Sequence, residues 1–217
     1  MERLRDRLRA IPTINEAPRW DPGDSPEDPY ELFISWLDDA IDGGAPVPHA
    51  VTLSTVDEDG SPDARVVVLK DVTRQLELGV ASGTESAKGR QLSWDPRCAL
   101  TFYWPAVARS VRIRGAAHRG TSAEAAADFT ARHPDARALA LTDLQSTPMS
   151  DVAEHERMIE DGRARIDADP GLVSPTWAVW WIVPDQVEFW QGAVSRDHLR
   201  VRYRRRGGVW RHERLWP

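Results

Sequence analysis

The spacing of apolar residues divides the chain into helical and strand-like segments. After a proline- and acid-rich stretch over residues 12–28, apolar side chains recur at helical spacing from Pro29 until Gly43 and Gly44 end the pattern, with Asp28 placed to cap the helix. Further helices are expected over residues 1–10, 87–94, 122–131 and 151–167. Alternating or short unbroken apolar runs predict strands over residues 50–56, 64–70, 76–81, 98–104, 110–117, 177–183, 187–190, 199–205 and 209–215.

These segments indicate a mainly β fold with helical additions. Because short turns join the first five strands, consecutive strands are expected to be antiparallel neighbours, as in a meander or a small barrel. A length of 217 residues suits one domain of ordinary size. We therefore expect an N-terminal arm over residues 1–28 and a single domain over residues 29–217.

Composition narrows the class of function. Charged residues make up 29% of the chain and its net charge is −6, so it lacks the overall basic field that nucleic-acid-binding proteins use. The single cysteine, Cys98, lies in an apolar strand, which favours a buried, inert thiol and leaves no disulfide or cysteine zinc site. No apolar run is long enough to cross a bilayer. We expect a cytoplasmic protein that binds small molecules, without nucleic acid, membrane or metal partners.

Cationic side chains follow the strand near the C-terminus. Val187–Gly192 reads Val-Glu-Phe-Trp-Gln-Gly, and four ionisable residues then recur at every second position: Arg196, His198, Arg200 and Arg202. In an extended segment these four side chains would share one face. Beside Trp190 and a glycine turn, such guanidinium groups suit a planar, phosphorylated ligand. The alternative is an edge strand that carries charge to avoid aggregation.

A second set of residues suits a phosphate group. Ser86 and Lys88 stand at the start of the helix expected over residues 87–94, where free backbone N–H groups and the helix dipole favour an anion. Arg65 and Lys70 flank an apolar strand and should lie on opposite faces unless a bulge re-aims one of them. The alternative is solvated charge at the ends of strands and helices. The tryptophans expected in the core are Trp36, Trp94, Trp104, Trp177 and Trp180.

Four separated motifs resemble the pyridoxamine 5'-phosphate oxidase family. They are Arg65-Val-Val-Val-Leu-Lys70, Ser86-Ala-Lys-Gly-Arg-Gln-Leu92 before Asp95-Pro96, the pair Gln145-Ser146, and Val187-Glu-Phe-Trp-Gln-Gly192 with Arg196-x-His198-x-Arg200. The motifs keep the family's order from about residue 30 to the end of the chain. The resemblance implies an FMN-binding split β-barrel and a homodimer with two flavin sites at the subunit interface.

The resemblance also implies a role for individual residues. The implied flavin contacts, some of them from the partner subunit, are Arg65, Val66, Lys70, Ser82, Lys88, Gln145, Ser146, Trp190 and Arg200. The implied substrate contacts are Lys70, Arg132, Arg196 and His198. Lys70 and Arg132 would take the substrate phosphate, and Arg196 and His198 would be the catalytic residues that orient the ring and assist the proton. The implied reaction oxidises pyridoxamine or pyridoxine 5'-phosphate to pyridoxal 5'-phosphate and reduces dioxygen to hydrogen peroxide.

Four positions depart from the family's pattern. Asp128 and Ala136 stand where the family usually has a tyrosine and a serine at the substrate phosphate, and Ala87 and Ser110 replace an arginine and a glutamine that contact the flavin. Asp128 is an anion beside an expected anion site, so it should point away or pair with Arg132. Two alternatives stay open: a related flavin oxidase that acts on a reduced ring in specialised, phenazine-like metabolism, and a non-catalytic split-barrel protein that holds flavin or haem.

Overall fold

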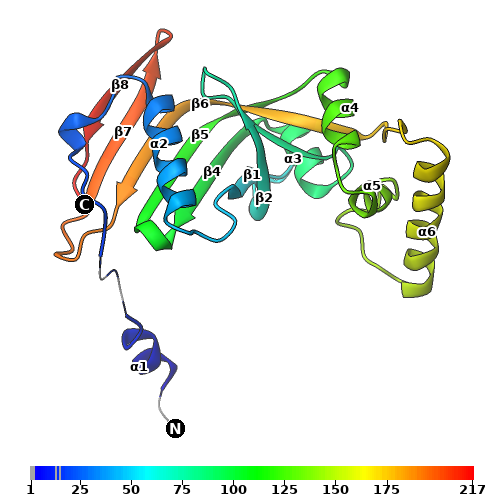
Figure 1. Cartoon of the computed structure of the whole chain (residues 1–217), viewed down its shortest axis with the longest axis horizontal. Helices are drawn as coiled ribbons and strands as arrows, with labels where there is room; N and C mark the ends of the chain where they lie inside the picture. Colours follow the sequence, from blue (N-terminus) through cyan, green and yellow to red (C-terminus); the bar gives the residue numbers. More distant parts are fainter. Residues whose placement is uncertain (1–2, 13, 15) are drawn as a thin grey trace. The chain divides into compact units, whose positions relative to one another are not determined.

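The computed structural model describes residues 3–12, 14 and 16–217, and Figure 1 labels their helices and strands. These residues fall into two compact units. The central unit comprises His49–Leu100 and Arg114–Asp185, and the terminal unit comprises the described residues up to Pro48, Thr101–Ile113 and Gln186–Pro217. The strands that belong to both units are β4 (Arg97–Trp104), β5 (Arg109–Arg119) and β6 (Trp177–Gln191). The expected division into an arm over residues 1–28 and one domain over residues 29–217 stays a prediction.

The first three strands form an antiparallel meander in the central unit. They are β1 (Ala50–Val56), β2 (Pro62–Val72) and β3 (Leu78–Gly83). In β1 the side chains of Val51, Leu53 and Thr55 are buried and alternate with half-buried ones, as the period of two predicted. β3 pairs on its other side with Trp177–Ile182 of β6.

The strand order of the sheet is β3-β2-β1-β4-β5-β6-β7-β8, and the pairing of β3 with β6 closes β1 to β6 into a barrel. The expectation that the first five strands are all sequential neighbours is wrong for β3 and β4. A helix, α3 (Ala87–Trp94), separates these strands in the chain, so β4 pairs with β1 instead. Beyond the barrel, β7 (Leu199–Arg206) and β8 (Val209–Arg214) form an antiparallel hairpin around a turn at Gly207-Gly208.

β6 is one strand where two were expected, over residues 177–183 and 187–190. Its first part, to Ile182, pairs with β3, and its last part, from Gln186, pairs with β7. Pro184 lies between these two paired parts. Its missing N–H therefore removes no hydrogen bond from either of these two ladders, and the proline does not end the strand.

Helix α2 (Pro29–Asp42) packs its apolar face on aromatic rings of the terminal unit. Trp36 meets Phe189 of β6 edge to face, with ring centroids 5.1 Å apart, and Phe33 meets Phe102 of β4 at 5.3 Å. Burial of each ring contributes about 2–3 kcal/mol relative to exposure. These rings form an apolar core for the terminal unit.

Side-chain caps mark the start of several of the remaining helices. Ser86 caps α3, and Thr121 with Glu124 forms a capping box at the start of α4 (Ser122–Thr130). The other helical segments are α1 (Leu4–Arg9), α5 (Pro134–Ala140), α6 (Val152–Ala168), and the 3₁₀ turns η1 (Pro22–Asp24) and η2 (Pro105–Val107). α5 was not predicted, because seven residues are too short to display a helical period.

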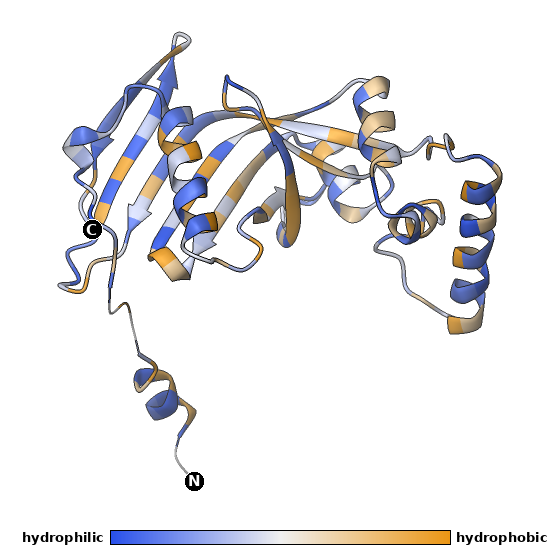
Figure 2. Ribbon diagram, in the orientation of Figure 1, coloured by the Kyte–Doolittle hydropathy of each residue, from blue (hydrophilic) through white to orange (hydrophobic). Residues whose placement is uncertain are grey.

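α6 is hydrophilic along most of its length (Figure 2) and buries only Gly162 and Ile166. A Cβ at Gly162 would lie 2.9 Å from the Ala138 carbonyl oxygen, so glycine allows α5 and α6 to approach closely. None of the helices in the described part of the chain combines the length and apolarity that a membrane crossing needs.

Four of the five tryptophans expected in the core are buried: Trp36, Trp104, Trp177 and Trp180. The expectation is wrong for Trp94, which is 62% exposed. Trp94 is the last residue of α3, and Leu92 is the residue that this turn of the helix buries. Cys98 is half-buried, and desolvation raises the pKa of its thiol to about 12, as expected for an inert cysteine.

Candidate functional site

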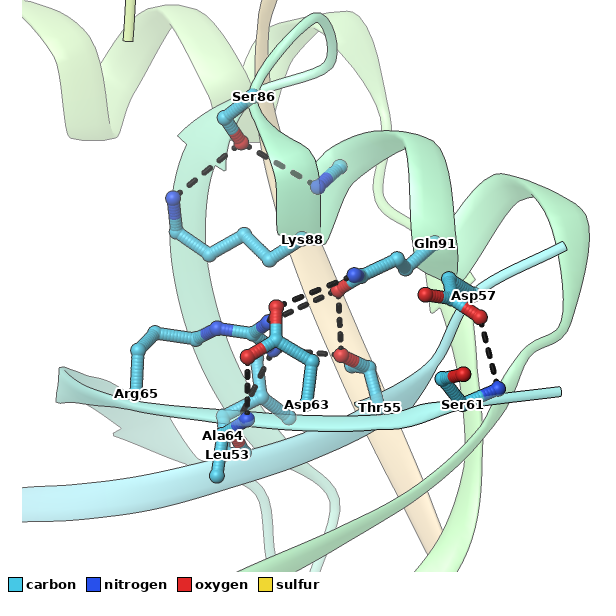
Figure 3. A network of polar contacts seen from close by, with 11 residues as sticks. Leu53, Thr55, Asp57, Ser61, Asp63, Ala64, Arg65, Ser86, Lys88 and Gln91 are labelled. Carbon is cyan, nitrogen blue, oxygen red and sulfur yellow. Dashed lines mark hydrogen bonds and ion pairs between the residues drawn. The ribbon is translucent and has the colours of Figure 1, made fainter. Parts of the chain in front are cut away.

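A polar network in the central unit holds the guanidinium of Arg65 on β2 (Figure 3). Arg65 Nη1 donates to the Thr55 hydroxyl on β1 at 2.5 Å, and Nη2 donates to Gln91 Oε1 on α3 at 2.8 Å and to the Asp63 carboxylate. The Gln91 amide also donates to Asp63 at 3.2 Å, and this bond and the Arg65 charge hold the pKa of Asp63 below its usual range. Because several elements hold it, the guanidinium keeps one orientation.

Ser86 and Lys88 form the start of α3. Ser86 Oγ accepts hydrogen bonds from the Gly89 N–H and from Lys88 Nζ, both at 3.2 Å (Figure 3). Lys88 is only 9% exposed, and burial, together with the charge of Arg65, lowers the pKa of its ammonium group to about 8. An anion at this helix start would restore the favourable surroundings that burial removes from the ammonium.

Residues that are distant in the chain meet around one cavity of about 400 Å³ in the central unit. Of the residues expected to contact flavin, those that line it are Arg65, Val66, Lys88, Gln145 and Ser146. Ser82, another expected flavin contact, lies on β3, and its buried hydroxyl has no hydrogen-bond partner among the described residues. Two cations, a helix start and further polar groups fit a phosphate group, and the Asp63 carboxylate that also lines the cavity is paired with Arg65.

Lys70 and Arg132, expected at the substrate phosphate, belong to a second cluster in the central unit. Lys70 Nζ forms an ion pair with Asp128 Oδ1 at 3.2 Å, and Asp128 Oδ2 accepts from Trp177 Nε1 at 2.9 Å. The Arg132 guanidinium lies 4.2 Å above the Trp177 ring centroid. Asp128 is thus paired, but its partner is Lys70 and not the expected Arg132. An irregularity in the β2 ladder beside Lys70 is of the kind that re-aims a side chain.

Arg132 lines a larger cavity of about 530 Å³ in the central unit. Gln145 and Ser146 line both cavities, so the two are neighbours. Arg132 Nη2 donates to the Ala136 carbonyl at 3.4 Å, whereas its buried Nε has no partner within the described residues. Desolvation lowers the pKa of the guanidinium, and the Asp128 charge opposes this shift.

In the terminal unit a buried carboxylate holds Arg200. Glu188 on β6 is 5% exposed and accepts from Arg200 Nη2 at 2.6 Å and from Arg112 Nη2 on β5 at 2.7 Å. Arg200 also donates to the Trp216 carbonyl at 3.0 Å. Glu188 therefore sets the direction of the Arg200 side chain.

Trp190 and His198 lie against each other in the same unit, with ring centroids 5.0 Å apart. The Ala193 backbone N–H donates to His198 Nδ1 at 3.1 Å. This bond assigns the proton of the neutral imidazole to Nε2, which can donate to a ligand.

The expectation that four ionisable residues share one strand face is wrong for two of them. β7 begins at Leu199, so Arg196 and His198 precede the strand, and Arg196 has a left-handed φ of +71°. The alternation applies only to Arg200 and Arg202, which lie two apart within β7.

The residues expected to contact flavin or substrate fall into two groups, one in each unit. The central unit contains Arg65, Val66, Lys70, Ser82, Lys88, Arg132, Gln145 and Ser146, and the terminal unit contains Trp190, Arg196, His198 and Arg200. Sequence reasoning missed the residues that hold them, namely Thr55, Asp63, Gln91 and Glu188. Gln91 and Glu188 stand inside two of the quoted motifs, which was the available signal.

A closed β-barrel with cations and a helix start around one cavity defines a class: barrel proteins with a site for an anionic, phosphate-like group. The chain belongs to the pyridoxamine 5'-phosphate oxidase family. Residues 37–166 match the model described as pyridoxamine 5'-phosphate oxidase. Residues 177–217 match the model described as pyridoxine 5'-phosphate oxidase C-terminal dimerisation region.

Relatives cover most of the chain. It is 42% identical over 197 residues to the pyridoxine/pyridoxamine 5'-phosphate oxidase of Pseudomonas paraeruginosa, across 89% of this chain and 90% of that protein. It is 37% identical over 194 residues to the enzyme of that name from Rhodospirillum rubrum, across 88% of this chain and 96% of the relative.

Solved structures confirm the expected split β-barrel fold. PhzG from Burkholderia lata 383, solved in complex with tetrahydrophenazine-1-carboxylic acid, matches with a TM-score of 0.85 at 24% identity, over 93% of this chain and 99% of that one. A pyridoxamine 5'-phosphate oxidase-related, FMN-binding protein from Nostoc punctiforme matches with a TM-score of 0.72 at 20% identity, over 87% and 98% of the two chains.

Proposed function

We propose that the chain is an FMN-dependent oxidase that converts pyridoxamine or pyridoxine 5'-phosphate to pyridoxal 5'-phosphate. The observation that carries the proposal is the cavity lined by Arg65, Val66, Lys88, Gln145 and Ser146, because strand, helix and loop residues bring cations and polar groups to one place. The names of the relatives that cover most of the chain support the same substrate.

The flavin phosphate would lie at the start of α3. Arg65 and Lys88 would hold it through charge-assisted hydrogen bonds, and the free N–H groups of the helix would add to them. The Ser82 hydroxyl is available as a further donor. When bound, FMN supplies the two-electron redox chemistry of the reaction.

Both subunits of a homodimer would contribute to each site. Trp190, Arg196, His198 and Arg200 lie in the segment that matches the dimerisation region. We therefore place two flavin sites at the subunit interface, each completed by residues of this segment. The cytoplasmic location expected from the single Cys98 stays a prediction.

On the substrate side, Lys70 and Arg132 would hold the phosphate, and Arg196 and His198 would orient the ring. Since His198 Nδ1 accepts from the Ala193 N–H, its Nε2 donates to the substrate oxygen or amine and exchanges a proton there. In total the substrate loses two electrons and two protons, which dioxygen takes up as hydrogen peroxide. With the amine substrate, water then displaces ammonia from the imine.

Two measurements test the proposal. Mass analysis of the small molecule released on denaturation should identify FMN, and both vitamers should yield peroxide and pyridoxal 5'-phosphate. His198→Asn should lower kcat by about 10²–10⁴, whereas His118→Asn, at an exposed position, should leave it unchanged. Purified protein without flavin would refute the proposal. Bound flavin without turnover of either vitamer would favour an oxidase of another reduced ring.

A further inference from the structure

The Lys70–Asp128 pair changes the charge of the proposed substrate-phosphate subsite. The Asp128 side chain is 15% exposed and the Lys70 side chain 33% exposed, so solvent screens this pair only in part. Trp177 Nε1 holds the second carboxylate oxygen at 2.9 Å. The carboxylate is thereby fixed with its charge directed at the Lys70 ammonium.

The Arg132 guanidinium stacks on Trp177 and donates to the Ala136 carbonyl at 3.4 Å, and the negative charge of Asp128 also acts on it. The cavity that Arg132 lines also carries carboxylates, on Glu85, Asp143, Asp151 and Glu154. These carboxylates lower the positive electrostatic potential in the cavity beside the Arg132 guanidinium.

Lys70, Arg132 and Asp128 together sum to a charge of +1, where the two cations alone would give +2. A phosphate monoester carries about −1.5 to −2 charges at neutral pH, and a carboxylate carries one. We propose that Asp128 is a specificity-determining residue that weakens binding of a phosphate dianion at Lys70 and Arg132 and matches the subsite to a singly charged anionic group.

This inference rests on the proposed function, since it takes Lys70 and Arg132 as the anchor of the substrate's anionic group. It deepens that function by naming the substrate class: rings that carry one negative charge at the anchored end, either a carboxylate or a phosphate monoester in its monoanionic form. A phosphorylated vitamer in its dianionic form is still a substrate, but it binds in competition with the Asp128 carboxylate for Lys70.

The test compares the flavin-loaded wild type with Asp128→Asn, which keeps an oxygen for Trp177 and removes the charge. At pH 8, where phosphate is a dianion, the KM for pyridoxine 5'-phosphate and the inhibition constant of inorganic phosphate should each fall about tenfold, because Lys70 regains a free charge-assisted bond. The inhibition constant of nicotinate, a ring with one carboxylate, should change less than threefold. Asp167→Asn, which removes an exposed charge on α6, should change none of these constants.

The outcomes separate the inference from the proposed function. If Asp128→Asn leaves the phosphate constants unchanged or raises them, while Lys70→Met and Arg132→Met raise the KM about tenfold or more, the anchor stands and the role of Asp128 is refuted. If the two methionine variants leave the KM unchanged, the anchor itself is misplaced and this part of the proposed function fails. An equal change for phosphate and nicotinate would also overturn the charge selection.

Discussion

Replacing Lys88 with methionine should stabilise the flavin-free protein and weaken flavin binding. Methionine keeps most of the buried chain length and removes the ammonium, which the fold holds at 9% exposure. A fall of the pKa from 10.5 to about 8 corresponds to about 3 kcal/mol of destabilisation at neutral pH. Loss of the bond to Ser86 offsets about 1 kcal/mol of this. We expect a net gain of about 2 kcal/mol in the free energy of unfolding.

The stability difference between wild type and Lys88→Met should depend on pH, because the pKa of Lys88 differs between the folded and unfolded chain. The unfolded chain keeps the Lys88 proton up to its ordinary pKa of 10.5, whereas the folded chain releases it near 8, so the unfolded state binds more protons between these values. Wild-type stability should therefore rise relative to Lys88→Met from pH 8 to 10.5, and the advantage of the variant should disappear by the upper value. The cost of burial is fully present below pH 8.

Urea denaturation of flavin-free wild type and Lys88→Met at pH 7 and pH 10.5, at equal protein concentration, measures both effects. Lys70→Met is the matched control, because Lys70 is more exposed and paired with Asp128, so its removal should not stabilise the fold. Titration with FMN should show an affinity lower by about ten- to a hundredfold for Lys88→Met. A variant less stable than wild type at pH 7, or a stability gain that does not depend on pH, would refute the reasoning.

Three further predictions concern residues that hold the site or the fold. Gln91→Leu frees one side of the Arg65 guanidinium, so FMN affinity, measured by fluorescence titration, should fall about tenfold with unchanged circular dichroism; unchanged affinity would show that Thr55 and Asp63 hold Arg65 without Gln91. Glu188→Gln removes the buried charge that Arg200 and Arg112 share, and because both guanidinium groups reach solvent, urea denaturation should show a loss of about 1–2 kcal/mol, with an unchanged free energy of unfolding contradicting it. Cys98, with its pKa raised to about 12, should react with a thiol reagent at pH 8 only after unfolding, and rapid reaction of the native protein would contradict its burial.

Local signals in the sequence determined most helix and strand positions. The bounds of β1 and α3 agree with the expected residues 50–56 and 87–94, because apolar period and capping residues act over a few neighbouring positions. The same signals failed where the structure depends on distant partners. Pro184 reads as a strand break, but it lies between two paired parts of β6 that contact different strands.

The sequence by itself determined which residue types the site contains, since the motifs place Arg65, Lys88 and the Gln145-Ser146 pair in fixed order. Only the tertiary structure decided what each charge contacts. Closure of the barrel brings β2, α3 and the loop after α5 around one cavity, and this same packing pairs Lys70 with Asp128. Charge interactions act through space over a few ångströms, so their partners follow from the fold and not from spacing along the chain.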